Sequence, residues 1–546
     1  MSTKQPLRSI MLLFAALSLG YLVAGCSAAK LQSLNPPRTM DEKSCAGEMA
    51  ARKDFARKAQ PSGIAVINRD AAPPDFNTEE YDYIRENEFR DAARTPLSTF
   101  SIDVDTASYA NLRRFINASQ LPPADAVRIE EMINYFDYDY PQPEDGHPFS
   151  ITTEVSGCPW NRENRLVHIG LQGRSLDYEN LRPCNLVFLI DSSGSMQDAN
   201  KLPLLKQSLR LLLDGLTARD RVAIVAYAGA AGLVLPSTPA GRKEEIIAAI
   251  DRLQAGGSTA GGAGIQLAYA TAKQNLVTGG NNRVILCTDG DFNVGVSSTA
   301  SMVRMMEEYR KTDIYLTICG FGMGNYKDGR MEQISKAGNG NYFYIDSIRE
   351  AKKVFVKQMR ANMFTIAKDV KVQIEFNPAK VKAYRLIGYE NRVMPDEDFN
   401  NDLKDAGELG AGHTVTALYE IMPVGSNQAV GGTDPLKYQQ VKTTDAAAGA
   451  EVMTVKLRYK QPRQSASRLI TVPVSDAGTA FAGASENFRF SAAVAGLGMI
   501  LRDSQFKKDL TLSDVIRLAR GSRGRDTEGY RAEFITLAET CALLKK

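Results

Sequence analysis

Histidine is scarce in this sequence. Only three histidines occur among 546 residues, His147, His168 and His413, far apart and without a spacing of four along a helix. Catalytic zinc sites and Ser-His-Asp triads depend on histidine, so neither is expected. An excess of one charge is also lacking, because 66 lysines and arginines face 63 aspartates and glutamates. A net charge of +3 does not favour nucleic acid or another polyphosphate as a partner.

Long apolar runs are lacking beyond the first 25 residues. The uncharged stretches 223–241 and 253–272 are interrupted by Gly, Pro, Ser or Thr, so no membrane span is expected there. The seven cysteines are sparse and irregularly spaced, unlike those of a small disulfide-stapled domain. Cys158 and Cys184 could form a disulfide or stay reduced, and the sequence leaves both outcomes open.

What is present is an ordinary globular composition over a long chain. Hydrophobic residues make up 44% and charged residues 24%, which excludes a chain that is disordered or fibrous as a whole. At about 100–200 residues per domain, the length predicts about three or four folding units.

Residues 1–25 have the three-part layout of a secretory signal, with basic residues, an apolar run and then small residues. The segment Leu22-Val23-Ala24-Gly25-Cys26 resembles a bacterial lipobox. This resemblance implies cleavage before Cys26 and attachment of two or three acyl chains to that residue. Acyl chains in that number anchor a protein stably in a membrane. Ser27 follows, and the sorting rule of such lipoproteins then implies the outer membrane of a Gram-negative cell, on its periplasmic face or at the cell surface. A plain cleaved signal with an incidental cysteine is the alternative.

The next three segments differ in their predicted order. Residues 26–95 are rich in Ala, Pro and charge without a sustained period, which predicts a flexible tether. Residues 96–145 contain one strand-like and two amphipathic stretches and predict a small α+β module. Residues 146–182 hold β segments that we expect to pair with a C-terminal β-domain.

Residues 183–358 predict a doubly wound α/β domain. Five apolar runs, LVFLI, VAIVAY, VILC, IYLTIC and YFYI, alternate with longer segments of helical periodicity. Continuous apolar strands separated by helices are typical of a mainly parallel sheet covered on both faces. Right-handed crossovers bring the loops that follow the strands to one edge, where ligands bind in such sheets.

Beyond this domain the pattern changes twice. Residues 366–475 show the alternating pattern of strands and predict a β-rich domain, and residues 485–546 predict a C-terminal helical segment. Because β segments lie on both sides of the α/β domain, the sequence favours an α/β domain inserted into a β-domain.

Oxygen-bearing side chains gather in the predicted loops of the α/β domain. Asp191, Ser193 and Ser195 alternate directly after the first apolar strand. Thr259 and Asp289 lie in two further loops expected at the same edge. Hydroxyls and carboxylates without Cys or His favour a hard divalent cation, Mg²⁺ or Mn²⁺. A helix cap formed by one of the two serines is the structural alternative.

This Asp-x-Ser-x-Ser turn, with a distant Thr and a later Asp, resembles the metal-ion-dependent adhesion site of von Willebrand factor type A (VWA) domains. The resemblance implies a Rossmann-like fold for residues 183–358, a bound Mg²⁺ or Mn²⁺, and a glutamate or aspartate of a partner protein that completes the metal's shell. Asp291 and Asn293 lie beside the site and are candidates for shaping partner choice, with a solvated loop as the alternative. The flanks, among them FSIDVDTASYANLRRFI and TDGDFNVG, are similar to a bacterial lipoprotein family with this domain at its centre.

Together these features predict a membrane-anchored, divalent-metal-dependent protein-binding module of the bacterial cell envelope, for adhesion or scaffolding, that is not an enzyme. One alternative is a metal-dependent hydrolase or phosphoryl-transfer enzyme with Ser193 or Ser195 as nucleophile. It is disfavoured because DSSGS lacks the Gly-x-Ser-x-Gly elbow and the chain has no phosphate-binding Gly-x-x-x-x-Gly-Lys-Ser/Thr loop. The other alternative is a structural envelope lipoprotein whose metal only braces the fold. The sequence does not determine the oligomeric state.

Overall fold

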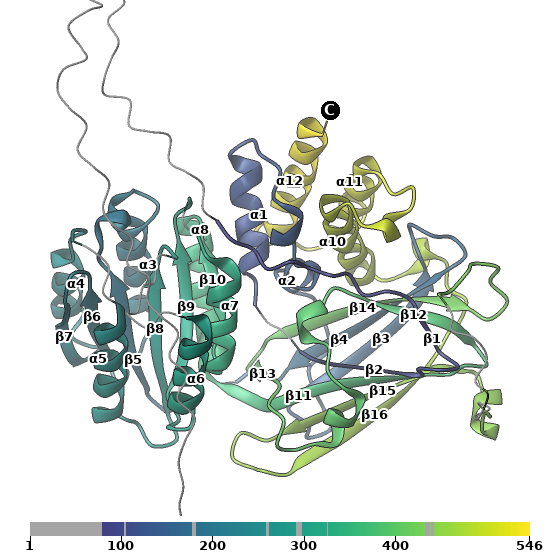
Figure 1. Cartoon of the computed structure of the whole chain (residues 1–546), viewed down its shortest axis with the longest axis horizontal. Coiled ribbons are helices and arrows are strands. Elements are labelled where there is room, and N and C mark those ends of the chain that lie inside the picture. Colours follow the sequence, from purple (N-terminus) through teal and green to yellow (C-terminus); the bar gives the residue numbers. More distant parts are fainter. Residues whose placement is uncertain are drawn as a thin grey trace, which may run out of the picture. The chain divides into compact units, whose positions relative to one another are not determined.

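The computed structural model of the chain contains an α/β unit, two β-sheets packed face to face and a layer of helices (Figure 1). The structure describes residues 79–102, 105–176, 182–257, 261–290, 298–324, 326–431, 437 and 442–545.

The α/β unit is built on a six-stranded sheet with the strand order β10-β9-β8-β5-β6-β7. Its strands are β5 (Cys184–Asp191), β6 (Arg221–Tyr227), β7 (Ala231–Pro239), β8 (Asn281–Thr288), β9 (Tyr315–Phe321) and β10 (Tyr342–Ile345). Neighbouring strands are parallel except β6 and β7, which form an antiparallel pair at one edge. The predicted Rossmann-like, mainly parallel sheet is confirmed.

Helices cover both faces of this sheet (Figure 1). One face carries α3 (Leu202–Gly215), α4 (Lys243–Arg252), α8 (Ile348–Lys352), the π-helical stretch η4 (Lys353–Gln358) and α9 (Met359–Met363). The other face carries α5 (Gly261–Gln274), α6 (Thr299–Arg310) and α7 (Asp328–Ala337). Side chains of a strand alternate between faces, so Leu186 and Phe188 of β5 enter one core and Val187 and Leu189 enter the other.

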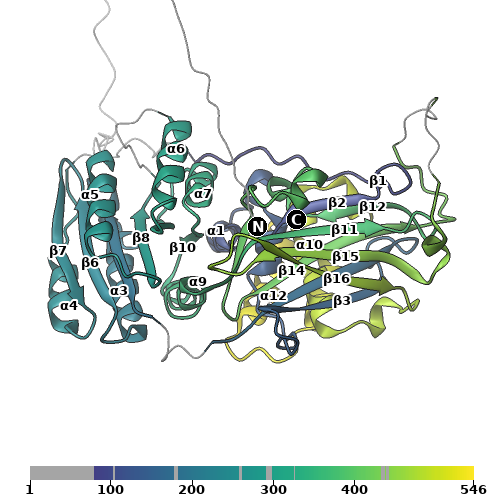
Figure 2. The ribbon, with the colours of Figure 1, turned by 90° about the horizontal axis from the view of Figure 1, so that it is seen from below.

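The two remaining sheets pack over a shared apolar core (Figure 2). One sheet has the order β1-β12-β14-β4-β3, and the other has the order β13-β11-β15-β16, with β2 also paired to β11. Their strands are β1 (Arg90–Asp91), β2 (Leu97–Ser101), β3 (Phe149–Gly157), β4 (Arg165–Gly173), β11 (Thr365–Phe376), β12 (Val381–Ile387), β13 (Gly407–Gly410), β14 (Thr414–Pro423), β15 (Glu451–Lys460) and β16 (Ser467–Ser475).

Strands from both sides of the α/β unit share one sheet. β4 precedes the α/β unit and β14 follows it, and the two pair antiparallel over eight residues of register from Arg165↔Ile421 to Gln172↔Thr414. The α/β unit is therefore inserted between strands of a β-sandwich.

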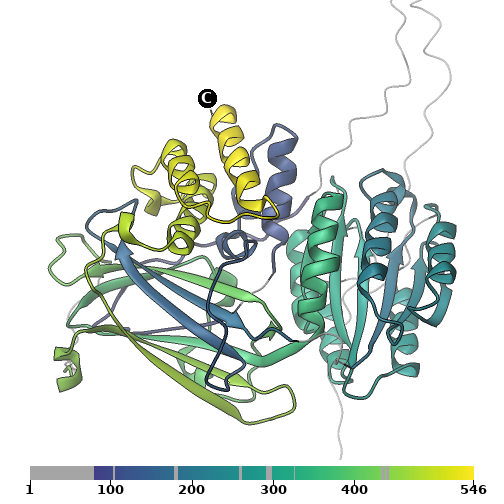
Figure 3. The same cartoon turned by 180° about the vertical axis from the view of Figure 1, so that it is seen from behind.

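A helical layer covers the sheet that contains β4 and β14 (Figure 3). Its helices are α1 (Ala107–Asn117), α2 (Ile129–Asn134), α10 (Glu486–Arg502), α11 (Leu512–Arg520) and α12 (Tyr530–Leu544). Residues 96–145 are thus not a separate module. Their strand β2 pairs with β11 of the sandwich, and α1 and α2 share one apolar core with the C-terminal helices. The short segment cannot bury its own apolar faces, so its two ends complete different cores.

Residues 79–95 differ from the prediction of a tether through residue 95. Glu79 forms a buried ion pair with Arg114 of α1, and Asn87 donates to the backbone carbonyls of Leu386 and Gly388. This segment is held by partners far away in the chain. Its own hydrophobic pattern therefore has no helical or strand periodicity that would reveal its order. We call residues 79–82 the N-terminal strap.

Two further observations concern the described residues. No described helix is long and apolar enough to cross a membrane. The cysteines within the described ranges form no disulfide with one another. Cys158 and Cys184 are both buried, and the Cys184 sulfur lies 3.6 Å from that of Met363.

Candidate metal centre

The turn after β5 brings together three of the predicted ligands. Asp191 is the last residue of β5, and its Oδ1 accepts a hydrogen bond of 2.9 Å from the backbone N–H of Ser193. The Ser193 and Ser195 hydroxyl oxygens lie 3.0 Å apart. Gly194 N–H donates to the carbonyl of Gly257 at 3.1 Å, which ties this turn to the loop before Thr259. Alternate residues of one turn therefore present a carboxylate and two hydroxyls together.

The strand next to β5 brings in the fourth ligand. β8 is parallel to β5, with Cys287 opposite Ile190, so Asp289 emerges at the same edge as Asp191. Thr288 donates its hydroxyl to Asp191 Oδ2 at 3.3 Å, and Asp289 is buried. The structure thus places both aspartates at the edge of the sheet where the sequence expects them.

The electrostatics of Asp191 indicate a carboxylate that lacks solvent. Burial raises its pKa above the ordinary range of an aspartate, and the neighbouring charge of Asp289 raises it further. Hydrogen bonds from Ser193 and from the Tyr227 hydroxyl, 3.1 Å from Oδ2, oppose this rise and favour the charged form. Two buried carboxylates at one place make a position where a cation is stabilised.

A buried lysine, which the sequence did not single out, completes the site. The ammonium of Lys201 donates to Asp289 Oδ2 at 3.1 Å and to the Ser195 carbonyl at 2.9 Å. Lys201 comes directly before α3, where a lone lysine is ordinarily a solvated residue, so its sequence context carried no signal. Its ammonium joins the DSSGS turn to the loop after β8.

Other predicted residues lie outside the described ranges. These are Thr259, the partner-choice candidates Asp291 and Asn293, and the lipidation candidate Cys26.

The donor set that is described fits a hard cation. Among the described residues no group of three or more His, Cys, Asp and Glu side chains could hold a metal. The candidate centre instead combines the carboxylates of Asp191 and Asp289 with the hydroxyls of Ser193 and Ser195. Oxygen donors of this kind suit Mg²⁺ or Mn²⁺ and do not suit zinc, which favours nitrogen and sulfur.

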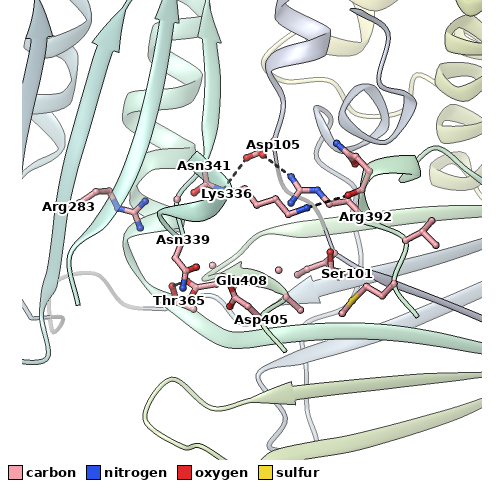
Figure 4. Close-up of a pocket in the computed structure, with 18 residues that line it drawn as sticks. Ser101, Asp105, Arg283, Lys336, Asn339, Asn341, Thr365, Arg392, Asp405 and Glu408 are labelled. Carbon is pink, nitrogen blue, oxygen red and sulfur yellow. Dashed lines mark hydrogen bonds and ion pairs between the residues drawn. The ribbon is translucent and has the colours of Figure 1, made fainter. Parts of the chain in front are cut away.

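A separate cavity of about 170 Å³ lies between the α/β unit and the sandwich (Figure 4). It is lined by charged side chains that bond to protein groups: Asp105 accepts from Arg392 at 3.1 Å, and Thr365 donates to Glu408 at 2.9 Å. Arg283, near the start of β8, also lines it. The six residues from there to Asp289 span about 20 Å of strand, so this cavity is distinct from the candidate metal centre.

Comparisons with known proteins agree with this architecture. The model of the von Willebrand factor type A domain matches residues 185–357, a model described as von Willebrand factor matches residues 75–168, and one described as the C-terminal region of uncharacterized protein YfbK matches residues 361–544. The uncharacterized protein YfbK of Escherichia coli strain K12 is 41% identical over 507 residues, which cover 91% of this chain and 86% of that protein. The chain belongs to the YfbK family.

This chain also has local similarity to other proteins. For this chain, the 60 kDa subunit of magnesium chelatase from Rhodobacter capsulatus is 33% identical over 117 residues, 21% of this chain and 20% of that subunit. A solved structure, von Willebrand factor type A from Catenulispora acidiphila, is 18% identical with a TM-score of 0.38 and covers 70% of this chain and 88% of its own. By the matches to the family models, this YfbK-family chain carries a VWA domain at residues 185–357, followed by the YfbK C-terminal region.

Proposed function

We propose that this chain is a divalent-metal-dependent protein-binding module of the bacterial cell envelope. The observation that carries the proposal is the convergence of Asp191, Ser193, Ser195 and Asp289 at the edge where open α/β sheets bind ligands. These residues, with Thr259, would hold Mg²⁺ or Mn²⁺. When bound, such a cation supplies a coordination position for an aspartate or glutamate of the partner.

The surrounding side chains hold the ligands in place. Asp191 receives hydrogen bonds on both carboxylate oxygens, from Ser193 N–H on one and from Tyr227 and Thr288 on the other. Lys201 orients Asp289. A site that is ordered before the partner arrives loses less entropy on binding, which supports a binding role.

The enzymatic alternative has less support from the described residues. The Ser193 hydroxyl lies 3.0 Å from the Ser195 hydroxyl, which is no general base. His168 is buried under the helical layer and is hydrogen-bonded to Tyr140, so it belongs to the core of the protein. Lys201 directs its ammonium to a carbonyl and a carboxylate. These contacts favour ligand positioning over activation of a nucleophile.

A pull-down from envelope extract tests the binding role. The full mature chain should retain a partner in Mg²⁺ and release it in EDTA, and Ser193→Ala should lose the partner in both conditions. Ser192→Ala is the matched control, because the Ser192 hydroxyl donates to the Tyr227 carbonyl at 3.1 Å. Equal recovery from all samples would contradict the proposal. Loss of stability in EDTA with the partner still bound would favour a metal that only braces the fold.

The lipid anchor is the second part of this proposal. It is supported by the lipobox-like Leu22–Cys26 and by Ser27, which favours the outer membrane. In whole cells Cys26→Ser should move the protein from the membrane fraction to the soluble fraction, whereas Cys45→Ser should not. Release by both variants, or by neither, would contradict anchoring through Cys26.

A further inference from the structure

The N-terminal strap contacts the loop that follows β9. The Glu79 carboxylate binds Arg114 of α1 through two bonds of 2.7 and 2.9 Å and accepts a third, of 2.9 Å, from Gly324 N–H. The Glu79 side chain is 4% exposed, whereas that of Glu80 is 76% exposed. Backbone bonds of Glu80 to Tyr326 and Asp328 extend the contact along the same loop. A buried ion pair at this place, rather than a surface one, therefore holds the strap.

The same loop packs directly on Lys201. Gly322 and Gly324 both have positive φ, 76° and 96°, a conformation that favours glycine. A Cβ atom at Gly322 would lie 2.3 Å from Cε of Lys201, so the loop backbone rests against the lysine side chain. The Gly322 carbonyl accepts a hydrogen bond from the hydroxyl of Tyr344. The Arg114 guanidinium lies over the ring of that tyrosine, 5.5 Å from its centroid. The Glu79–Arg114 ion pair therefore contacts the loop directly at Gly324 and, through Tyr344, at Gly322.

From Lys201 the contacts continue into the candidate metal centre. Its ammonium bonds Asp289 Oδ2 and the Ser195 carbonyl, so its position decides how these two groups are held. The described contacts thus run without a break from Glu79 through the 322–324 loop and Lys201 to Asp289.

We propose that the strap is a positioning element of the metal centre: the Glu79–Arg114 ion pair fixes the 322–324 loop, which fixes Lys201 and, through it, Asp289 and Ser195. This inference rests on the proposed metal-binding function and adds a part of the chain that positions its ligands.

Metal titration of the full mature chain tests this inference. Isothermal titration with Mg²⁺ and Mn²⁺ alone should show about threefold to tenfold weaker binding for Glu79→Gln. An amide offers one acceptor oxygen where the carboxylate offers two, so the contacts to Arg114 and Gly324 cannot all be kept. Glu80→Gln is the matched control, one residue away and exposed, and its affinity should equal that of the wild type.

The outcomes separate the two proposals. If the wild type binds neither cation, the proposed function is wrong. If the wild type binds and Glu79→Gln binds equally well, the metal centre stands and the positioning role of the strap is wrong. An equal loss for both glutamine variants would also overturn the positioning role, because it would show a general effect of charge.

A second variant addresses a loss of folding. Tyr344→Phe removes only the hydroxyl that donates to Gly322, and it should weaken Mg²⁺ binding in the same direction. Unfolding in EDTA is followed for each variant, so that a change in global stability is told apart from a change in metal affinity. If Glu79→Gln does not fold, Tyr344→Phe decides: an unchanged affinity overturns the proposal, and a weaker one supports it.

Discussion

Lys201 and Asp289 form an ion pair of 3.1 Å inside the candidate metal centre, between the start of α3 and the loop after β8. Lys201 is 5% exposed and Asp289 1%. The single positive charge of Lys201 lies near two buried carboxylates, those of Asp191 and Asp289. In their charged forms these three groups carry a net charge of −1, which a divalent cation at this place would offset.

Replacing Lys201 should lower the stability of the metal-free protein. Lys201→Met leaves two buried carboxylates without this cation, and breaking such a pair costs about 3 kcal/mol. Because Lys201 then no longer holds Asp289 and the Ser195 carbonyl in place, Mg²⁺ should raise Tm by less in the variant than in the wild type. Lys206→Met, within α3 and bonded at the surface to the Asp251 carbonyl, serves as control. Calorimetry with and without EDTA checks this, and an unchanged Tm in EDTA would contradict it.

Replacing Asp191 should separate folding from metal binding. Asp191→Asn removes a buried charge that stands beside Asp289, while its amide oxygen can still accept from Ser193 N–H. We expect its Tm in EDTA to equal or exceed that of the wild type. The wild type should gain about 2.7 kcal/mol at a Mg²⁺ concentration of 100 times Kd, and the variant should gain nothing. A Mg²⁺-dependent rise in the Tm of Asp191→Asn would argue against this ligand.

Acid should destabilise the protein through His168. Burial lowers the pKa of this imidazole to about 3, so the folded state stays neutral there while the unfolded chain takes up a proton below about pH 6.5. The unfolded state then binds more protons, and stability falls with pH from about 6.5 down to about 3. Between pH 7 and pH 5 the wild type should lose about 2 kcal/mol more than His168→Gln. Urea unfolding at both pH values measures this difference, and equal losses would refute it.

The α/β unit should depend on Arg113 for its attachment to the helical layer. Arg113 of α1 lies 2.6 Å from Asp346 and 2.7 Å from Glu350 of the α/β unit, and 2.8 Å from Glu533 of α12. Arg113→Met leaves these acids buried without that cation, so we expect a loss of about 3–5 kcal/mol in urea unfolding.

Arg349→Met provides the matched control for Arg113. Arg349 also binds Glu533, at 2.6 Å, but its side chain is 44% exposed. An exposed pair of this kind contributes about 1 kcal/mol or less. Equal effects of the two variants would show that burial of Arg113 does not govern its contribution.

Local sequence patterns were sufficient to predict the α/β sheet and the positions of two of its loops. The apolar strand that ends at Asp191 and the one before Asp289 predicted parallel neighbours, and parallel neighbours place both acids at one edge. The burial of Lys201 could not be predicted in this way. Its partners Asp289 and Gly322 are more than 80 residues further along the chain, and no local period marks the contact.

The strap shows the same limit at the other end of the chain. Around Glu79 the sequence has the composition of a linker and predicts a flexible tether through residue 95. Its order comes from Arg114 and Gly324, and that of Asn87 comes from carbonyls about 300 residues away. A segment without its own apolar face becomes ordered only when the rest of the chain supplies its partners.

The amino-acid sequence by itself determined the VWA-type sheet and the oxygen-rich turns. Apolar periodicity and the residues at strand ends are local properties, and parallel pairing of the strands places those end residues at one edge of the sheet. Only the tertiary structure decided which cation is buried against Asp289, that helices from both ends of the chain share one core, and that Glu79 reaches the loop beside Lys201. Those contacts join residues far apart in sequence, and they form because buried charge and apolar surface must find partners wherever the fold provides them.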